Sequence, residues 1–186
     1  MSVTAYKSSG TQVNVERGSF TPWFDPTDAA ASDDIRVSAP LEKDDGQSDW
    51  LRLTNFGFTS GDVPAGANID GIEVSIERQS GEELDVSDEY IKLRDSAATQ
   101  QGDNKASATG WSTDIDETIV YGGAADTWNA GLDQADIISS NFGIDIAAIN
   151  TDSIAREARV DHVKIRVYYT EATPTASPIA HILQMI

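Results

Sequence analysis

The clearest pattern in the chain is a short-range alternation of hydrophobic and polar residues. Residues 72–77 read Ile-Glu-Val-Ser-Ile-Glu, which predicts a strand with Ile72, Val74 and Ile76 facing inward and the polar residues facing water. Residues 159–170 show the same period, with Val163, Ile165 and Val167 on one face. Both segments therefore indicate strands of a sheet that has one buried face.

The same reading predicts about eight strands. They fall at residues 12–16, 35–37, 50–58, 69–78, 86–93, 118–121, 141–148 and 159–170. Turn residues separate them, as in Val63-Pro64-Ala65-Gly66, where Gly66 is expected to adopt a positive φ. Residues 132–138 favour the one helical turn. The predicted fold is an all-β, antiparallel, jelly-roll-like β-sandwich.

The ends of the chain differ in composition from the middle. We expect residues 1–17 to form an N-terminal arm, 18–170 the β-sandwich domain and 171–178 a linker containing two prolines. Residues 179–186 are strongly apolar, and the expected docking residues are Ile179, Ile182, Leu183, Met185 and Ile186. A free apolar segment favours docking on a neighbouring subunit, whereas an edge strand of its own domain is the alternative.

The charge balance narrows the classes of partner. The chain has 31 Asp and Glu against 13 Lys and Arg, a net charge of −18. Such a surface repels nucleic acid and anionic membranes, so neither is an expected partner. Abundant Asp with few Lys is typical of proteins adapted to high salt, and an ordinary solvated surface is the alternative. No stretch reaches the ~20 apolar residues of a membrane span.

Candidate chemistry is sparse. The chain has two histidines and no cysteine, and it lacks the glycine-rich phosphate loops and the nucleophile elbow of common enzymes. Pairs of acidic residues are numerous enough to arise by chance. We therefore predict a protein that is not an enzyme and needs no cofactor.

A structural cation such as calcium is a secondary hypothesis. Hard cations bind several oxygen ligands from one or two loops. Asp44, Asp45 and Asp49 on one loop are the weak cation candidates, and Asp114, Asp116 and Glu117 form a second set.

Tryptophan supplies the remaining candidates. Trp23, Trp111 and Trp128 lie in loop-like segments and are the candidates for surface recognition. Tryptophan in a strand-rich domain more often packs in the core or anchors a loop.

Two segments, Trp50–Phe58 and Val63–Arg78, follow the pattern FGF…IPxGAxIxGIxVxIxR, with Val63 at the first Ile position. Through these segments, residues 20–170 resemble a family of tailed-phage and prophage proteins. The resemblance continues through Trp111, Tyr121-Gly122-Gly123, Asp126-Thr127-Trp128, Asn141–Ile144 and Val160–Thr170. These motifs are glycines at turns and alternating strands, and they carry no catalytic residue.

The resemblance implies a jelly-roll virion structural protein, and the acidity suggests a virus of a halophilic host. The leading hypothesis is a capsid decoration or cement protein on the capsid surface, made in the host cytoplasm. It would bind the major capsid protein and copies of itself, as a homotrimer. The alternative is a receptor-binding or tail- or vertex-associated module that recognises a host surface glycan or surface-layer protein.

Overall fold

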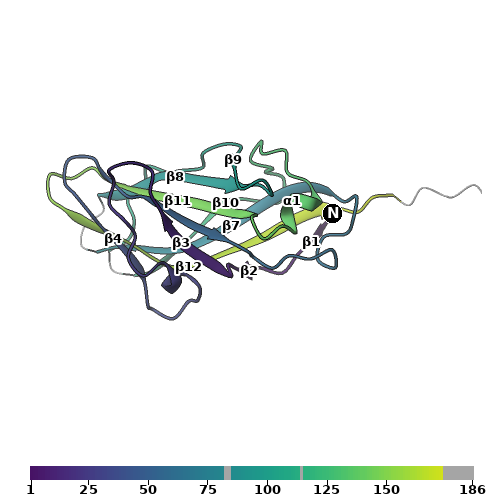
Figure 1. Ribbon diagram of the computed structural model, residues 1–186, viewed down its shortest axis with the longest axis horizontal. Helices are drawn as coiled ribbons and strands as arrows, with labels where there is room; N and C mark the ends of the chain where they lie inside the picture. The colour runs from purple at the N-terminus through teal and green to yellow at the C-terminus, as the bar shows by residue number, and fades with distance from the viewer. Residues whose placement is uncertain (82–84, 114, 174–186) are drawn as a thin grey trace, which may run out of the picture.

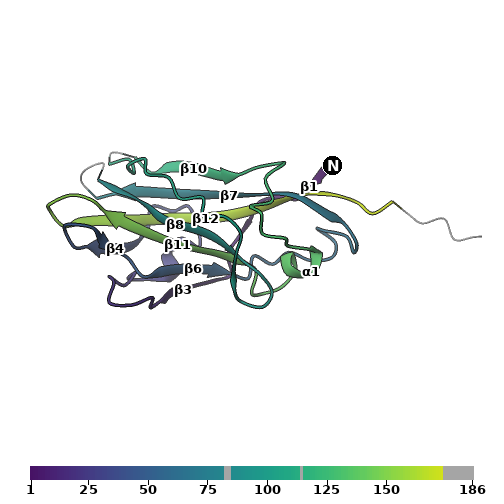
Figure 2. The same cartoon turned by 90° about the horizontal axis from the view of Figure 1, so that it is seen from above.

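The computed structural model describes residues 1–81, 85–113 and 115–173. These residues form two six-stranded antiparallel sheets that pack face to face (Figures 1 and 2). The predicted antiparallel, jelly-roll-like β-sandwich is confirmed.

The first sheet is built on the longest strand of the described chain, β12. Its members are β1 (Ser2–Val3), β2 (Lys7–Ser8), β4 (Val37–Leu41), β12 (Arg156–Thr170), β7 (Asn68–Ser80) and β10 (Glu117–Gly122). Strand β12 pairs with β7 along most of its length, from Ala158↔Ser80 to Thr170↔Asn68. The pairing carries two register shifts, between Val160 and His162 and between Tyr168 and Tyr169. At the first of them Asp161 is the extra residue of a β-bulge.

The second sheet is centred on β11. Its members are β3 (Thr11–Val15), β6 (Trp50–Thr54), β5 (Gly46–Gln47), β11 (Gly143–Asn150), β8 (Val86–Arg94) and β9 (Gln100–Gln101). Two short helices lie outside the sheets, η1 (Pro26–Ala29) and α1 (Gln134–Ile137). The expected helical turn is therefore confirmed, and its N-terminus is capped by the Asp133 carboxylate, which accepts a hydrogen bond from the Asp136 backbone N–H.

Each expected strand overlaps an observed strand, and most boundaries move by one to three residues. The two largest differences are in β4 and β6. β4 begins only at Val37, and β6 ends at Thr54 because Asn55 takes a left-handed φ of 57°. The additional strands, β1, β2, β5 and β9, have two residues each and are too short for an alternating pattern to reveal them.

The segment predicted to be an arm belongs to the sandwich instead. β1 and β2 pair with β12, and β3 pairs with β6, so this segment contributes to both sheets. Ser2 lies opposite Tyr169. The start of the chain and the end of the described chain therefore lie at the same end of the sandwich (Figures 1 and 2).

The N-terminal segment that contains β1 and β2 also covers part of the outer face of β7, so the prediction for that face is wrong. Glu73 and Ser75 were expected to face water, but they are only 8% and 3% exposed. Glu73 accepts hydrogen bonds from Tyr6 and Tyr168 and pairs with Arg166 at 2.8 Å. Burial alone would raise the pKa of Glu73, but these donors lower it. Burial and the bond to Glu73 raise the pKa of Tyr6 to about 12.

Two glycines in or near β7 are required by the backbone, and Gly66 has the conformation that the sequence predicts. A Cβ on Gly71 would lie 2.1 Å from the Gly123 carbonyl oxygen, so glycine is required for this close backbone approach. Gly66 has a φ of 77°, the positive value that its turn needs.

The core between the sheets is mostly apolar, but a charged pair lies within it. Ile72, Val74 and Ile76 of β7 are buried with Ile144 and Ile146 of β11. Continuing the alternation along β7 brings Arg78 to the same inner face, and its guanidinium pairs with Asp88 of β8. The two side chains are 2% and 0% exposed, so this ion pair joins the two sheets through the interior.

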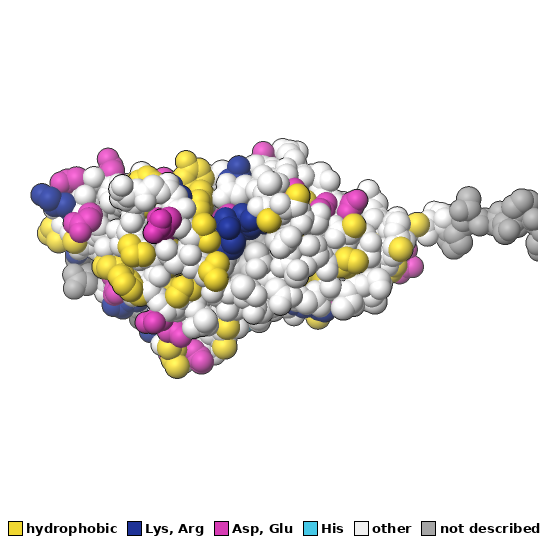
Figure 3. All heavy atoms as spheres, in the orientation of Figure 1, with side chains coloured by type: hydrophobic (Ala, Val, Ile, Leu, Met, Phe, Trp, Pro, Cys, Tyr) yellow, Lys and Arg dark blue, Asp and Glu magenta, His cyan; other side chains and the backbone are white. Residues whose placement is uncertain are grey.

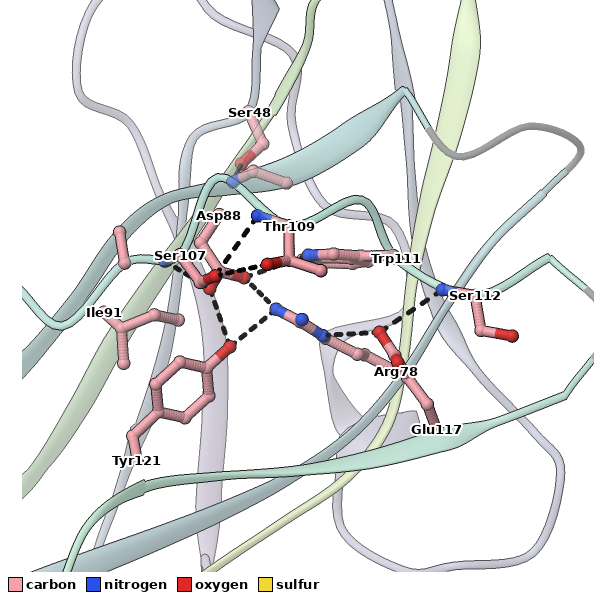
Figure 4. A network of polar contacts seen from close by, with 12 residues as sticks. Ser48, Arg78, Asp88, Ile91, Ser107, Thr109, Trp111, Ser112, Glu117 and Tyr121 are labelled. Carbon is pink, nitrogen blue, oxygen red and sulfur yellow. Dashed lines mark hydrogen bonds and ion pairs between the residues drawn. The ribbon is translucent and has the colours of Figure 1, made fainter.

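A network of donors surrounds the Asp88 carboxylate (Figure 4). It accepts hydrogen bonds from Tyr121 Oη at 2.7 Å, Trp111 Nε1 at 2.9 Å and the Ser107 backbone N–H at 2.9 Å. Arg78 also contacts Glu117 at 3.2 Å. Burial, together with the Asp88 charge, raises the pKa of Tyr121, so the phenol stays protonated and acts as a donor.

The linker and docking-tail predictions fall mostly beyond the described chain. Of the predicted linker, residues 171–173 are described, and residues 174–186 lie outside. The predicted docking residues Ile179, Ile182, Leu183, Met185 and Ile186 therefore lie outside the described residues. Within the described ranges, no helix has the length and apolarity needed to cross a membrane.

Candidate functional site

The three tryptophans proposed for surface recognition are buried. Trp23 is 2% exposed, and Trp111 and Trp128 are 0% exposed. Each indole N–H is bonded internally: Trp23 to the Asp49 carbonyl, Trp111 to the Asp88 carboxylate and Trp128 to the Ile72 carbonyl, all at 2.9 Å. The surface-recognition prediction is wrong for these residues, because each occupies the core and anchors its loop.

The three aspartates proposed for cation binding have separate roles. Asp44 and Asp45 lie in an exposed turn at φ of 56° and 68°. Asp49 is buried, and its carboxylate accepts hydrogen bonds from the Asn14 side chain at 3.1 Å and the Arg17 backbone at 3.2 Å. Asp49 therefore holds the chain segment that leads to Trp23, and the three carboxylates do not form a metal cluster in the described structure.

An aromatic cluster instead lies on the outer face of the second sheet. Leu51 and Leu53 of β6 point into the core, so Trp50 points outward. On β8, Tyr90 pairs with the small residue Ala147 of the central strand. The rings of Trp50 and Tyr90 meet edge to face, with centroids 5.2 Å apart.

Arg17 joins this cluster from the loop that follows β3. Its guanidinium lies 4.9 Å from the Trp50 ring centroid, 5.4 Å from that of Tyr90 and 4.3 Å from that of Phe20. It pairs with Glu89 and donates to the Ser48 carbonyl at 2.7 Å. These bonds fix the arginine among the rings, where cation–π contacts add to the packing. We call Arg17, Phe20, Trp50, Glu89 and Tyr90 the aromatic platform.

A row of polar side chains, which we call the polar strip, lies beside the aromatic platform on the same face, two residues further along each strand. Arg52, Asp145 and Lys92 are neighbours in register across β6, β11 and β8. The Asp145 carboxylate, 0% exposed, accepts hydrogen bonds from Arg52 at 2.9 Å, and from Arg94 and Gln100 at 2.8 Å each. Two guanidinium groups and one amide thus donate to one carboxylate. Lys92 has no ion pair with the residues that the structure describes, so its ammonium remains available to a ligand.

Figure 3 shows this outer face in space-filling form, with Lys and Arg side chains at its centre beside hydrophobic side chains. On a protein of net charge −18 this is an unusual concentration of positive charge. The platform and the strip combine apolar ring surface with fixed hydrogen-bond donors, which is the composition of a ligand-binding face.

Sequence reasoning missed this site although part of the signal was present. The alternation that buries Leu51 and Leu53 also places Trp50 on the opposite face. Nothing local in the sequence, however, connects Arg17, Trp50 and Tyr90, which come from three distant segments. The antiparallel pairing of β6, β11 and β8 brings them together.

The histidine on β12 also has a specific partner. Ser8 Oγ lies 2.7 Å from His162 Nε2. A hydrolytic triad would need a carboxylate on the other ring nitrogen, and no such bond is found within the described ranges. Two surface pockets lie away from this pair: Pro40, Glu157 and Arg159 contribute to one, and Ile69, Thr127 and Leu132 to the other.

Comparison with known proteins finds a loose structural likeness. No protein-family model and no curated protein matches the chain. The chain is similar to a solved structure of the CBM22-1 xylan-binding domain from Paenibacillus barcinonensis Xyn10C. The identity is 14%, the TM-score is 0.43, and the match covers 91% of this chain and 97% of that domain. A superposition this loose carries no argument about function.

Proposed function

We propose that this protein is a non-catalytic recognition module that binds a saccharide chain on the outer face of its second sheet. The observation that carries the proposal is the aromatic platform beside the polar strip. Sugar rings present apolar C–H faces that pack on aromatic rings, and hydroxyl groups that accept hydrogen bonds from Arg, Lys and Gln side chains.

The geometry of the face supports a chain-like ligand. Trp50 and Tyr90 lie in one row across the sheet, and Arg52, Asp145 and Lys92 lie in the next, two residues along each strand. Two residues of a strand span about 6.7 Å, so a ligand covering both rows is longer than a single sugar ring. Arg17 is held by Glu89 and Ser48 before any ligand arrives, which lowers the entropic cost of binding.

The test is binding to soluble polysaccharides by affinity electrophoresis, with xylan as a neutral probe and polygalacturonate as an acidic probe. We expect at least one probe to retard the protein, and Trp50→Ala to weaken that binding by a factor of ten or more, about 1.4 kcal/mol. Loss of a partly exposed ring on the outer face should leave the fold intact.

The matched control is Phe24→Ala, which removes a 51% exposed aromatic ring away from the platform. It should bind the probes as the parent does. If neither polysaccharide binds, or if Trp50→Ala binds as tightly as the parent, the proposed site is wrong.

The capsid decoration role stays a prediction that rests on the sequence resemblance and on the apolar residues 179–186. A decoration protein on a capsid lattice should be present in hundreds of copies per particle, whereas a tail or vertex module should be present in a handful. Quantitative gel or mass analysis of purified particles measures this number. A low copy number would favour the recognition role alone.

A further inference from the structure

A second site of a different kind lies on the first sheet. Carboxylate oxygens of Asp34, Asp116 and Asp161 all lie within 4.8 Å of one another. They come from the loop before β4, the residue before β10, and the bulge of β12. The site is therefore assembled by the tertiary fold. It shares Asp116 with the second acidic set that the sequence suggested, but its other two members come from distant segments.

Asp161 is the informative member. It is 1% exposed, and its Oδ1 has no hydrogen-bond partner among the described residues. Its Oδ2 accepts a long bond from the Asp34 backbone at 3.4 Å, and the Asp33 backbone N–H also interacts with the carboxylate. A buried carboxylate oxygen without a partner is costly. A β-bulge places an extra residue out of register and redirects its side chain, and here that side chain is directed at two more carboxylates.

The neighbouring charges leave the cluster negative. Arg36 donates to Asp116 at 2.8 and 2.9 Å and contacts Asp34 at 3.3 Å. One guanidinium thus faces three carboxylates. A divalent cation would neutralise the excess and supply the missing partner of Oδ1.

We propose that Asp34, Asp116 and Asp161 bind a divalent cation of the calcium type. Calcium takes six to eight oxygen ligands at about 2.3–2.6 Å, so ligand oxygens on opposite sides of the ion lie about 4.6–5.2 Å apart. Oxygens separated by no more than 4.8 Å can therefore bind one such ion. The Asp34 side chain is 86% exposed, so water can complete the coordination from that side.

The experiment uses the full chain, treated with a chelator and then titrated with CaCl2 at constant ionic strength. Constant ionic strength is needed because a protein of net charge −18 responds to general screening. We expect a saturable rise in Tm, and one calcium per chain by isothermal titration calorimetry. Asp161→Asn should weaken calcium binding at least tenfold, and in chelator it should melt no lower than the parent, because it removes a buried charge that lacks a partner.

Asp45→Asn is the control, because it removes an exposed aspartate from the turn that the sequence suggested. It should keep the calcium response of the parent. Asp34→Asn is a second test variant at an exposed position, and it should also weaken binding if Asp161→Asn does not fold. The proposal is overturned if the parent shows no saturable response to calcium, or if both Asp161→Asn and Asp34→Asn respond as the parent does. If Asp161 is simply protonated and binds no cation, the parent will show no saturable response to calcium.

Discussion

Replacing Asp88 by alanine is expected to destabilise the protein by about 3–5 kcal/mol, because it leaves the Arg78 guanidinium buried without its main partner. The substitution also removes the acceptor for Tyr121 Oη, Trp111 Nε1 and the Ser107 N–H. Domains of this size are stable by about 5–15 kcal/mol. Asp88→Ala should therefore remove a large share of the free energy of unfolding, or prevent folding.

Urea unfolding followed by tryptophan fluorescence measures the change in free energy. Asp103→Ala is the matched control, because the Asp103 side chain is 49% exposed and lies 3.9 Å from its lysine partner. Its effect should stay within about 0.5 kcal/mol. A loss below 1 kcal/mol for Asp88→Ala would mean that the interior pair does not hold the sheets together.

Replacing Trp128 by alanine should cost about 3–5 kcal/mol, the range for deleting a large buried aromatic side chain. The indole is fully buried, bonds to the Ile72 carbonyl at 2.9 Å and packs directly against Gly122. Trp128 also has a φ of 57°, an unfavourable backbone state for a bulky residue that the packing must offset.

This substitution separates a core role from a recognition role. Trp128→Ala should lower the midpoint of urea unfolding strongly, whereas Trp50→Ala should lower it only slightly while impairing polysaccharide binding. The opposite pattern, with Trp128→Ala stable and defective in binding, would restore Trp128 as a surface-recognition residue.

Much of the fold could be predicted because one face of each long strand is buried. The alternation at Ile72, Val74 and Ile76 determined the orientation of β7. Gly66 marked a turn that needs a positive φ, and at Gly71 the structure leaves no room for a Cβ atom. The same alternation contained an unused signal. It places Arg78 on the inner face, and a buried arginine implies a carboxylate partner on the other sheet.

The candidate sites could not be predicted because they depend on contacts between distant residues. The two-residue strands β1 and β2 carry no pattern, so the burial of Glu73 beneath Tyr6 was not visible in the sequence. The bulge at Asp161 depends on how β12 pairs with β7, and strand periodicity alone would have placed this carboxylate differently. Candidate aspartates were therefore chosen by proximity in sequence, whereas the fold groups Asp34, Asp116 and Asp161.

The pairing of Ser2 with Tyr169 has a mechanical consequence. When two antiparallel strands are pulled apart from the same end, their hydrogen bonds break one after another. A force applied to these two ends would therefore separate β1 from β12 with little resistance. Domains with neighbouring ends also tolerate insertion into a loop of a host protein. In such a chimaera both junctions would lie at one end of the sandwich, and the outer face carrying Trp50 and Tyr90 would remain uncovered.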